Sequence, residues 1–211
     1  MAPSPDTVKQ LLQDLMATGL KLQWLSLRTQ WEPALTQALG QVADDCLTLL
    51  RQELAALAAE PQTPPDWPAL TTRLIQSWAT MVSTRGQAAK ALLLALVKEV
   101  VAETGQILTL HGLAGEPPAL HAAGQDPRAA YEALAGGPAL DEAVAKSFQE
   151  FGGLLTAQVR QTAAGGLTMA ELFPRCQPIA RRWRARLETI ARTVAHEVFN
   201  RARVAAFQRL P

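Results

Sequence analysis

The residues of this chain whose types and spacing suit binding chemistry form a polar row near its C-terminal end. Arg192, His196, Asn200 and Arg203 follow one another at steps of four, four and three residues. This spacing places them along one side of an α-helix. Guanidinium groups in such a row attract a polyanion or an acidic protein surface. We therefore expect partner contacts from six residues: Arg181, Arg184, Arg192, His196, Asn200 and Arg203.

The uneven distribution of charge along the chain supports this interpretation. Residues 172–211 contain nine Arg and no Lys against two acidic residues, Glu188 and Glu197, whereas the preceding 171 residues carry 11 basic and 17 acidic side chains. The formal net charge of the whole chain is only +1, but its C-terminal end is strongly basic. A solvated helix face coated with Arg is the alternative interpretation of the same pattern.

The sequence lacks the arrangements that catalysis and metal binding require. His111, His121 and His196 form no H-x-x-x-H or H-E-x-x-H pair, and the acidic pairs Asp44–Asp45 and Glu99–Glu103 have no His beside them in a Glu-x-x-His motif. There is also no P-loop, G-x-S-x-G or G-x-G-x-x-G motif. We therefore expect a protein that is not an enzyme and that uses no cofactor, metal ion or small-molecule substrate.

The two cysteines indicate neither a disulfide framework nor a zinc site. Cys46 and Cys176 lie far apart in the sequence and have no C-x-x-C context. We expect two buried or half-buried thiols in a reducing compartment.

The polar row belongs to a helix that we predict over Cys176–Leu210, about 32 residues long from Pro178, which suits a first-turn position. Trp183 lies among four Arg of this segment, so it is either a core residue or an aromatic that stacks on a base. Apolar residues recur three or four positions apart and predict the buried side: Ile179, Trp183, Leu187, Ile190, Val194, Val198, Ala202 and Ala205.

Composition favours helices throughout the chain. Aromatic residues make up 5% of the sequence, and alternating Val/Ile-rich runs are absent. We predict an all-α fold, an elongated helical bundle of about five to seven helices with a long basic C-terminal helix. The charged fraction is 18%, below the usual value of about 25%, which favours oligomerisation or burial against a partner.

Proline and glycine residues mark the expected helix ends in the first half of the chain. A helix begins at Val8, with Gly19 as a point of interruption, and Pro33 then breaks it. A second helix over 34–59 completes an antiparallel hairpin. After a proline-rich connector, a further helix runs from Pro68 to Leu110 with a kink or break at 83–86.

The second half begins with a segment rich in Gly and Pro over 111–138, which leaves room for one short helix, Pro127–Leu134. Helices are then expected from Pro138 to about Thr162 and from Thr168 to Phe173, ahead of the basic helix. The chain accordingly divides into an N-terminal helical hairpin or bundle (1–110), a loop with a short helix (111–137) and a C-terminal helical region (138–211).

Neither a secretory signal nor a membrane-spanning segment is expected. The N-terminal residues show no basic region followed by an apolar core. The most apolar run, Ala88–Val101, contains Lys90, Lys98 and Glu99 and is shorter than the roughly 20 residues that a bilayer requires.

Part of the C-terminal helix resembles a known signature. Glu188–Thr193 reads Glu-Thr-Ile-Ala-Arg-Thr, and with Asn200, Ala202 and Arg203 it resembles the Ile-Ala-Arg-Thr…Asn-x-Ala-Arg signature of the head-morphogenesis, or minor head protein, family of tailed bacteriophages. Gly165–Leu172 resembles the Gly-rich turn and short helix that precede this signature. The resemblance is confined to residues 165–209, and the further compact block with which family members usually continue has no counterpart before Pro211.

The resemblance implies a structural protein of the virion, present in few copies near the portal vertex. Its partners would be the portal or capsid protein and, through the Arg-rich face, packaged DNA. It would assist assembly or genome delivery, located in the head interior or at the portal vertex and in the host cytoplasm during assembly, and would be oligomeric there. A non-enzymatic helical protein that binds nucleic acid independently of sequence is the alternative, with the Arg row on phosphates.

Overall fold

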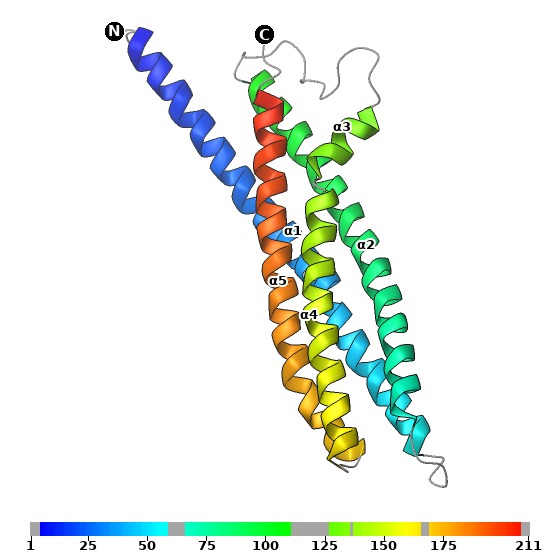
Figure 1. The fold of residues 1–211 in the computed structure, drawn as a ribbon. Helices are drawn as coiled ribbons and strands as arrows, with labels where there is room; N and C mark the ends of the chain where they lie inside the picture. Colours follow the sequence, from blue (N-terminus) through cyan, green and yellow to red (C-terminus); the bar gives the residue numbers. More distant parts are fainter. Residues whose placement is uncertain (1–4, 59–65, 111–126, 136, 166–168, 208–211) are drawn as a thin grey trace. The chain divides into compact units, whose positions relative to one another are not determined.

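The computed structural model describes residues 5–58, 66–110, 127–135, 137–165 and 169–207. These residues form five α-helices and no β-strand (Figure 1): α1 Pro5–Ala58, α2 Trp67–Leu110, α3 Pro127–Leu134, α4 Gly137–Ala164 and α5 Met169–Phe207. The predicted all-α fold class is confirmed. No helix in this described part is both long and apolar enough to cross a membrane.

Contacts group the chain into two compact units, each of which collects segments that are distant in sequence. The four-helix unit comprises residues 35–89 and 138–192 and so contains parts of α1, α2, α4 and α5. The terminal unit comprises residues 1–34, 90–137 and 193–211, with the remaining parts of α1, α2 and α5 and the whole of α3. The division into 1–110, 111–137 and 138–211 follows the order of the chain and stays a prediction.

Helix α5 has a buried stripe that repeats every eleven residues. Such a repeat corresponds to about 3.67 residues per turn, close to the 3.6 of a straight helix, so the stripe stays on one side without a left-handed supercoil. Three sets of buried positions share this spacing: Leu172, Trp183 and Val194; Cys176, Leu187 and Val198; Ala180, Ala191 and Ala202.

The predicted apolar side of the C-terminal helix is largely confirmed. Trp183, Leu187, Val194, Val198 and Ala202 are buried as predicted, whereas the flanking positions 179, 190 and 205 are half-buried. The prediction missed the alanines at 180 and 191, which lie at the centre of the stripe. Alanine has little apolar surface and gives a weak signal in the sequence, yet its small side chain lets neighbouring helices approach closely.

The core of the four-helix unit is formed by large side chains from all four of its helical segments. The buried side chains are Leu35, Leu39 and Leu50 of α1, Leu70, Leu74 and Trp78 of α2, Leu140, Phe151 and Leu155 of α4, and Leu172, Trp183 and Leu187 of α5. Polar groups at the edge of this core are paired. Trp78 donates its indole N–H to the carbonyl oxygen of Cys46 at 3.2 Å, and Arg85 binds the Asp45 carboxylate through two nitrogens at 2.8 and 3.1 Å.

Inside the terminal unit, α1 packs against α2 and α5 with one face. Gln23 is buried and donates to the carbonyl oxygen of Val100 and to the Thr104 hydroxyl of α2. The indole of Trp31 donates to the Glu99 carboxylate at 2.9 Å. Since Gln23 and Trp31 are eight residues apart, these bonds lie on one side of α1 and fix its rotation against α2.

The predicted break at Pro33, and the hairpin that depends on it, are wrong. Helix α1 continues through Gly19 and Pro33 to Ala58. Pro33 lacks the N–H that would bond the carbonyl of Thr29, but its ring is exposed. The apolar contacts on either side outweigh this local loss, because Leu35 and Leu39 are buried directly after it and Gln23 is buried before it.

Two further breaks are also absent. Helix α2 passes through 83–86, and it starts one residue before Pro68, where Asp66 accepts a hydrogen bond from the backbone N–H of Ala69 at 3.0 Å as an N-cap. Residues 169–173 of the short helix expected from Thr168 to Phe173 belong to helix α5, and Thr168 lies outside the described residues. Its internal prolines, Pro174 and Pro178, are four residues apart and exposed on one side, where water can bond the carbonyls they leave open.

The remaining helices agree with the sequence. Helix α3 spans Pro127–Leu134 as predicted. Helix α4 begins one residue before Pro138 and ends two residues after Thr162. It runs without interruption through Gly152 and Gly153, which have open space where a side chain would lie.

Both cysteines are free and buried, as the sequence predicted. Burial raises the pKa of the Cys176 thiol from 9.0 to about 11. Burial, and to a smaller extent the neighbouring Asp45 carboxylate, also raises the pKa of Cys46. Both thiols are therefore held in the neutral form, which disfavours a role as nucleophile or metal ligand.

Replacing Pro33 with Ala is expected to increase the free energy of unfolding by up to about 3 kcal/mol, because alanine restores the hydrogen bond to Thr29 and removes the clash of the ring. Urea denaturation followed by circular dichroism measures the change. Pro68→Ala is the control, since a first-turn N–H has no intrahelical acceptor and its replacement should bring no gain. Loss of stability in Pro33→Ala would contradict the explanation.

Cys176 predicts a pH dependence of stability. Because its pKa is higher in the folded state, its contribution is complete below about pH 9 and is lost as the pH rises towards 11. Between pH 8 and pH 10 the wild type should lose about 1 kcal/mol more unfolding free energy than Cys176→Ala. Equal losses in the two proteins, measured by denaturation at both pH values, would show that the thiol ionises as freely in the folded chain as in the unfolded one.

Candidate interaction site on helix α5

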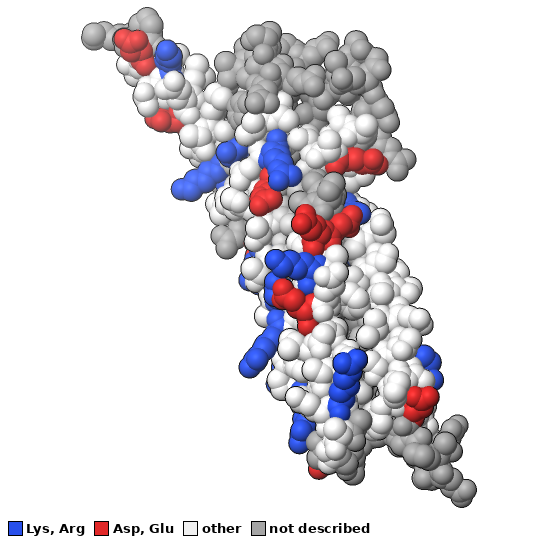
Figure 2. All heavy atoms as spheres, in the orientation of Figure 1, with Lys and Arg blue, Asp and Glu red and all other residues white. Residues whose placement is uncertain are grey.

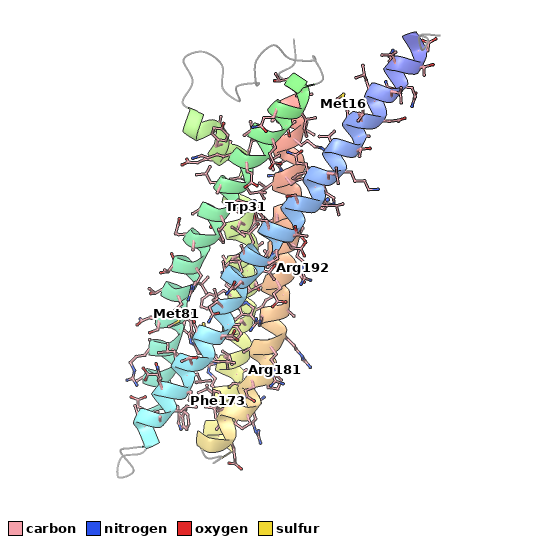
Figure 3. The ribbon with its side chains drawn as sticks, turned by 180° about the vertical axis from the view of Figure 1, so that it is seen from behind. Met16, Trp31, Met81, Phe173, Arg181 and Arg192 are labelled. Atoms are coloured by element: carbon pink, nitrogen blue, oxygen red, sulfur yellow. The ribbon has the colours of Figure 1, made fainter. Side chains whose placement is uncertain are left out.

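The six residues expected to contact a partner all lie on α5, but they belong to different compact units. Arg181, Arg184 and Arg192 are in the four-helix unit, whereas His196, Asn200 and Arg203 are in the terminal unit. The three arginines of the first group and His196 are exposed, and Asn200 and Arg203 are half-buried. Figure 3 labels Arg181 and Arg192 on the C-terminal helix. The row as one continuous partner surface stays a prediction.

Arg184 is engaged by two carboxylates within the four-helix unit. Its Nη1 atom lies 2.6 Å from Asp44 Oδ2 of α1, and its Nε atom lies 3.0 Å from Glu188 Oε1 of α5. The hydrogen bond to Glu188 and the charge of Asp44 raise the pKa of Arg184. Arg192 approaches the other Glu188 oxygen at 3.9 Å. The predicted contact residues Arg184 and Arg192 thus share a carboxylate, which reduces the positive charge they offer to a partner.

Two more arginines of α5 are paired in the same way. Arg186 forms a two-point pair with the Glu150 carboxylate of α4, and Arg201 lies 3.3 Å from Glu197 one turn away. Basic and acidic side chains lie side by side on the face shown in Figure 2, much of which carries no charge. Among the residues that the structure describes, Arg181 and Arg182 have no acidic partner within 4.0 Å. Arg175 of the same helix is also exposed and has no such partner among these residues, and of the three, Arg182 lines the pocket described next.

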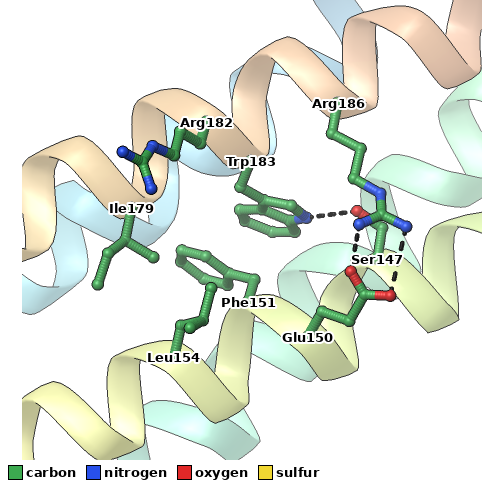
Figure 4. Close-up of a pocket in the computed structure, with 8 residues that line it drawn as sticks. All are labelled: Ser147, Glu150, Phe151, Leu154, Ile179, Arg182, Trp183 and Arg186. Carbon is green, nitrogen blue, oxygen red and sulfur yellow. Dashed lines mark hydrogen bonds and ion pairs between the residues drawn. The ribbon is translucent and has the colours of Figure 1, made fainter.

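A pocket of about 170 Å³ lies beside Arg182, between α4 and α5 of the four-helix unit (Figure 4). Its apolar lining comes from Phe151 and Leu154 of α4 and from Ile179 and Trp183 of α5. Its charged lining comes from Arg182 and the Arg186–Glu150 pair, and Ser147 completes it. Leu154 is 58% exposed at this pocket, so an apolar side chain already faces solvent there.

Trp183 belongs to the core and is not available to stack on a base. It is 4% exposed, its ring lies 3.9 Å from that of Phe151 at an interplanar angle of 12°, and its indole N–H donates to the Ser147 hydroxyl at 2.9 Å. Phe151 in turn lies 5.7 Å from the ring of Trp78. Of the two interpretations of Trp183, the structure therefore supports the core residue.

This arrangement can bind an apolar side chain that has a carboxylate beside it. A cavity of about 150 Å³ accommodates a benzene-sized ring, so the pocket has room for one bulky apolar side chain. Arg182 at its edge supplies a guanidinium that can bind a neighbouring carboxylate. Sequence reasoning missed the α4 residues of this pocket, because Ser147 and Trp183 are 36 positions apart and no local pattern joins them.

A second hollow, on the α1 side of the four-helix unit, is larger and more polar. It measures about 260 Å³ and is lined by residues of α1 and α5 that include Asp44, Arg51 and Phe173. The Arg51 guanidinium lies over the Phe173 ring at 4.6 Å, and Asp44 is bound to Arg184. Since both charged groups are engaged, this hollow offers fewer free contacts than the pocket beside Trp183.

The predicted contact residues of the terminal unit make contacts within that unit. The His196 ring meets Trp24 of α1 edge-on at 4.9 Å, and the Asn200 amide lies 3.3 Å from His196 Nδ1. Arg203 lies over the Phe199 ring at 5.7 Å. His196 and Asn200 therefore stabilise the packing of α5 on α1, in addition to any role towards a partner.

Several residues that carry the family resemblance also have a packing role. Ala191 and Ala202 are 2% and 0% exposed and belong to the buried stripe of α5, whereas Arg192 and Thr193 face outward. Small residues at 191 and 202 are thus explained by close helix packing in this chain. The outward residues of the resemblance are those that packing does not explain.

Among the residues with described positions, no three His, Cys, Asp or Glu side chains gather closely enough to hold a metal ion. Comparisons of the chain with protein-family models, with curated proteins and with solved structures found no match.

Removing the Ser147 hydroxyl is expected to leave the buried indole N–H of Trp183 without an acceptor. Ser147→Ala should therefore lower the free energy of unfolding by about 1–3 kcal/mol. In a Trp183→Phe background the same change should have a clearly smaller effect, because the donor is already absent. Denaturant unfolding of the four proteins of this cycle measures the coupling, and equal effects of Ser147→Ala in both backgrounds would rule out the hydrogen bond as the cause.

Proposed function

We propose that this chain is a non-enzymatic structural protein of a tailed-phage head, a minor head protein that associates with the portal or inner capsid. Helix α5 is its docking element, and the partner is a protein surface that presents acidic groups beside an apolar side chain. The protein assists assembly or genome delivery, and its location is the head interior or portal vertex.

The observation that carries the proposal is the combination of Arg182 with the apolar pocket that it lines, and the exposed Arg181 precedes it on the same helix. Interfaces are anchored by a bulky side chain in a pocket, with charged groups at the rim that select the partner. The pocket beside Trp183 has both components, with Leu154 exposed inside it and Arg182 at its edge. Arg192 and Thr193, which belong to the segment that resembles the minor head protein signature, are exposed on the same helix. Their exposure supports the assignment to a phage head.

The ion pairs favour a protein partner over nucleic acid. A protein that binds phosphates without reading sequence needs several unpaired cations along its surface. On α5, Arg184, Arg186 and Arg201 are each bonded to a carboxylate, and Arg192 lies near one. Trp183, the aromatic that could have stacked on a base, is buried. Sequence-independent DNA binding is therefore the alternative function, and the experiment described below distinguishes it from docking on a protein.

The test uses particles assembled in the presence of the full-length protein, with incorporation measured by quantitative mass spectrometry of purified particles. Arg181→Glu/Arg182→Glu should reduce incorporation at least about tenfold, equivalent to roughly 1.4 kcal/mol of binding free energy. Arg160→Glu is the matched control, because Arg160 is an exposed arginine of α4 in the same unit. It should leave incorporation unchanged, and far-UV circular dichroism should be the same for all variants.

The outcomes separate the two functions. Loss of incorporation in the double variant, together with weak DNA binding that shows little salt dependence, supports docking on a protein. High DNA affinity that falls steeply with salt, and that the double variant weakens, supports the nucleic-acid alternative. Normal incorporation of the double variant would reject α5 as the docking element.

A further inference from the structure

The first half of α1 exposes a stripe of large apolar side chains. Leu11, Leu15 and Leu22 are 55%, 57% and 62% exposed. Val8, Leu12 and Leu25 are also exposed. In Figures 1 and 3, the first turns of α1 lie apart from the α2 and α5 segments of the terminal unit, and Figure 3 labels Met16 on this part of α1. A contiguous apolar stripe of this kind marks an interaction surface.

The packing of the terminal unit does not use this stripe. Contacts of α1 with the rest of the unit come from another face of the helix, where Gly19 lies against Ile107 of α2 and Trp24 lies against Phe199 of α5. Gln23 belongs to the same packed face. Helix α1 therefore has one packed face in this region and a separate apolar stripe that has no partner among the described residues.

The spacing of the exposed stripe differs from that of the buried stripes. Val8, Leu15 and Leu22 recur every seven residues, and so do Leu11, Thr18 and Leu25, offset by three. These are the a and d positions of a heptad repeat, the pattern that packs one helix against another in a coiled coil. The buried stripe of α5 repeats every eleven residues instead. The heptad spacing thus identifies a second helix as the occupant.

We propose that this helix is the same segment of a second copy of the chain, packed in the antiparallel direction. In that arrangement Val8 faces the partner's Leu25, and Leu11 faces the partner's Leu22. Asp14 and Lys21 occupy successive g positions, at the edge of the stripe, and both are exposed. An antiparallel pair brings Asp14 opposite the partner's Lys21, and the two-fold symmetry repeats this ion pair at the other end.

Charge complementarity selects the antiparallel direction. In a parallel pair in register, a g position faces the e position five residues later on the other helix. Asp14 would then face Gly19 and Lys21 would face Ser26, neither of which carries a charge. Only the antiparallel pair matches opposite charges at these positions.

The length of the stripe predicts a modest affinity. Residues 8–25 span about 27 Å at about 1.5 Å per residue, which is fewer heptads than an isolated coiled coil needs. The segment is, however, already helical as part of α1, so pairing does not have to order it. We expect a dimer whose formation depends on protein concentration. This inference does not rest on the proposed function, because it concerns another helix and another partner.

Sedimentation velocity of the full-length protein over about a hundredfold range of concentration tests the pairing. The wild type should shift from monomer to dimer as the concentration rises. Leu11→Ser/Leu15→Ser should raise the dissociation constant at least about a hundredfold, because four leucines leave the interface of a symmetric dimer. A wild type that is monomeric throughout, or a dimer that this variant leaves unchanged, would overturn the proposal.

A charge exchange tests the direction of pairing. Asp14→Lys alone, or Lys21→Asp alone, places like charges together in an antiparallel homodimer. When the two variants are mixed, a heterodimer restores both ion pairs, and native mass spectrometry should show it about tenfold in excess over the homodimers. Lys9→Asp, which changes charge on the same helix outside the stripe, should dimerise like the wild type. A mixture without heterodimer preference would exclude the antiparallel pair.

Discussion

The four-helix unit depends on the contact between Trp183 of α5 and Phe151 of α4. Their rings stack at 3.9 Å, and the bond from the indole to Ser147 fixes the one polar atom that burial of Trp183 brings inside. Such a contact sets the rotation of α5 about its axis. Because Trp183 points inward, Arg181 and Arg182, which directly precede it on the helix, are exposed. The position of the candidate docking groups thus follows from core packing.

Part of the charge asymmetry of the sequence is offset within the fold. Arginines of α5 meet carboxylates from earlier helices, as Arg184 does with Asp44 of α1 and Arg186 with Glu150 of α4. Each such exposed pair contributes no more than about 1 kcal/mol to stability. Their effect on recognition is larger, because a paired guanidinium offers less charge to an external anion. A basic segment in a sequence is therefore an incomplete guide to a basic surface.

Prolines inside the helices show that tertiary packing can outweigh the local tendency of proline to end a helix. Pro33, Pro174 and Pro178 all lie inside helices, although each removes a backbone hydrogen bond. All three prolines are exposed, so water can donate hydrogen bonds to the backbone carbonyls that they leave unbonded. Burial of the neighbouring apolar side chains keeps the chain helical on both sides of each proline. Helix α3 starts at Pro127 as predicted, and helix α4 starts at Gly137, one residue before the predicted Pro138.

The all-α class, the start and end of α3 and most of the buried side of α5 could be predicted from the sequence, because helical periodicity is a property of neighbouring residues. The six predicted contact residues could be placed on one helix from the sequence, but their ion pairs and packing contacts could not. Whether Arg184 is free or paired, and whether Trp183 is a core residue, depends on Asp44 and Ser147, which lie 140 and 36 positions away. Only the tertiary structure decided these points, since contacts between distant segments leave no periodic signal along a single chain.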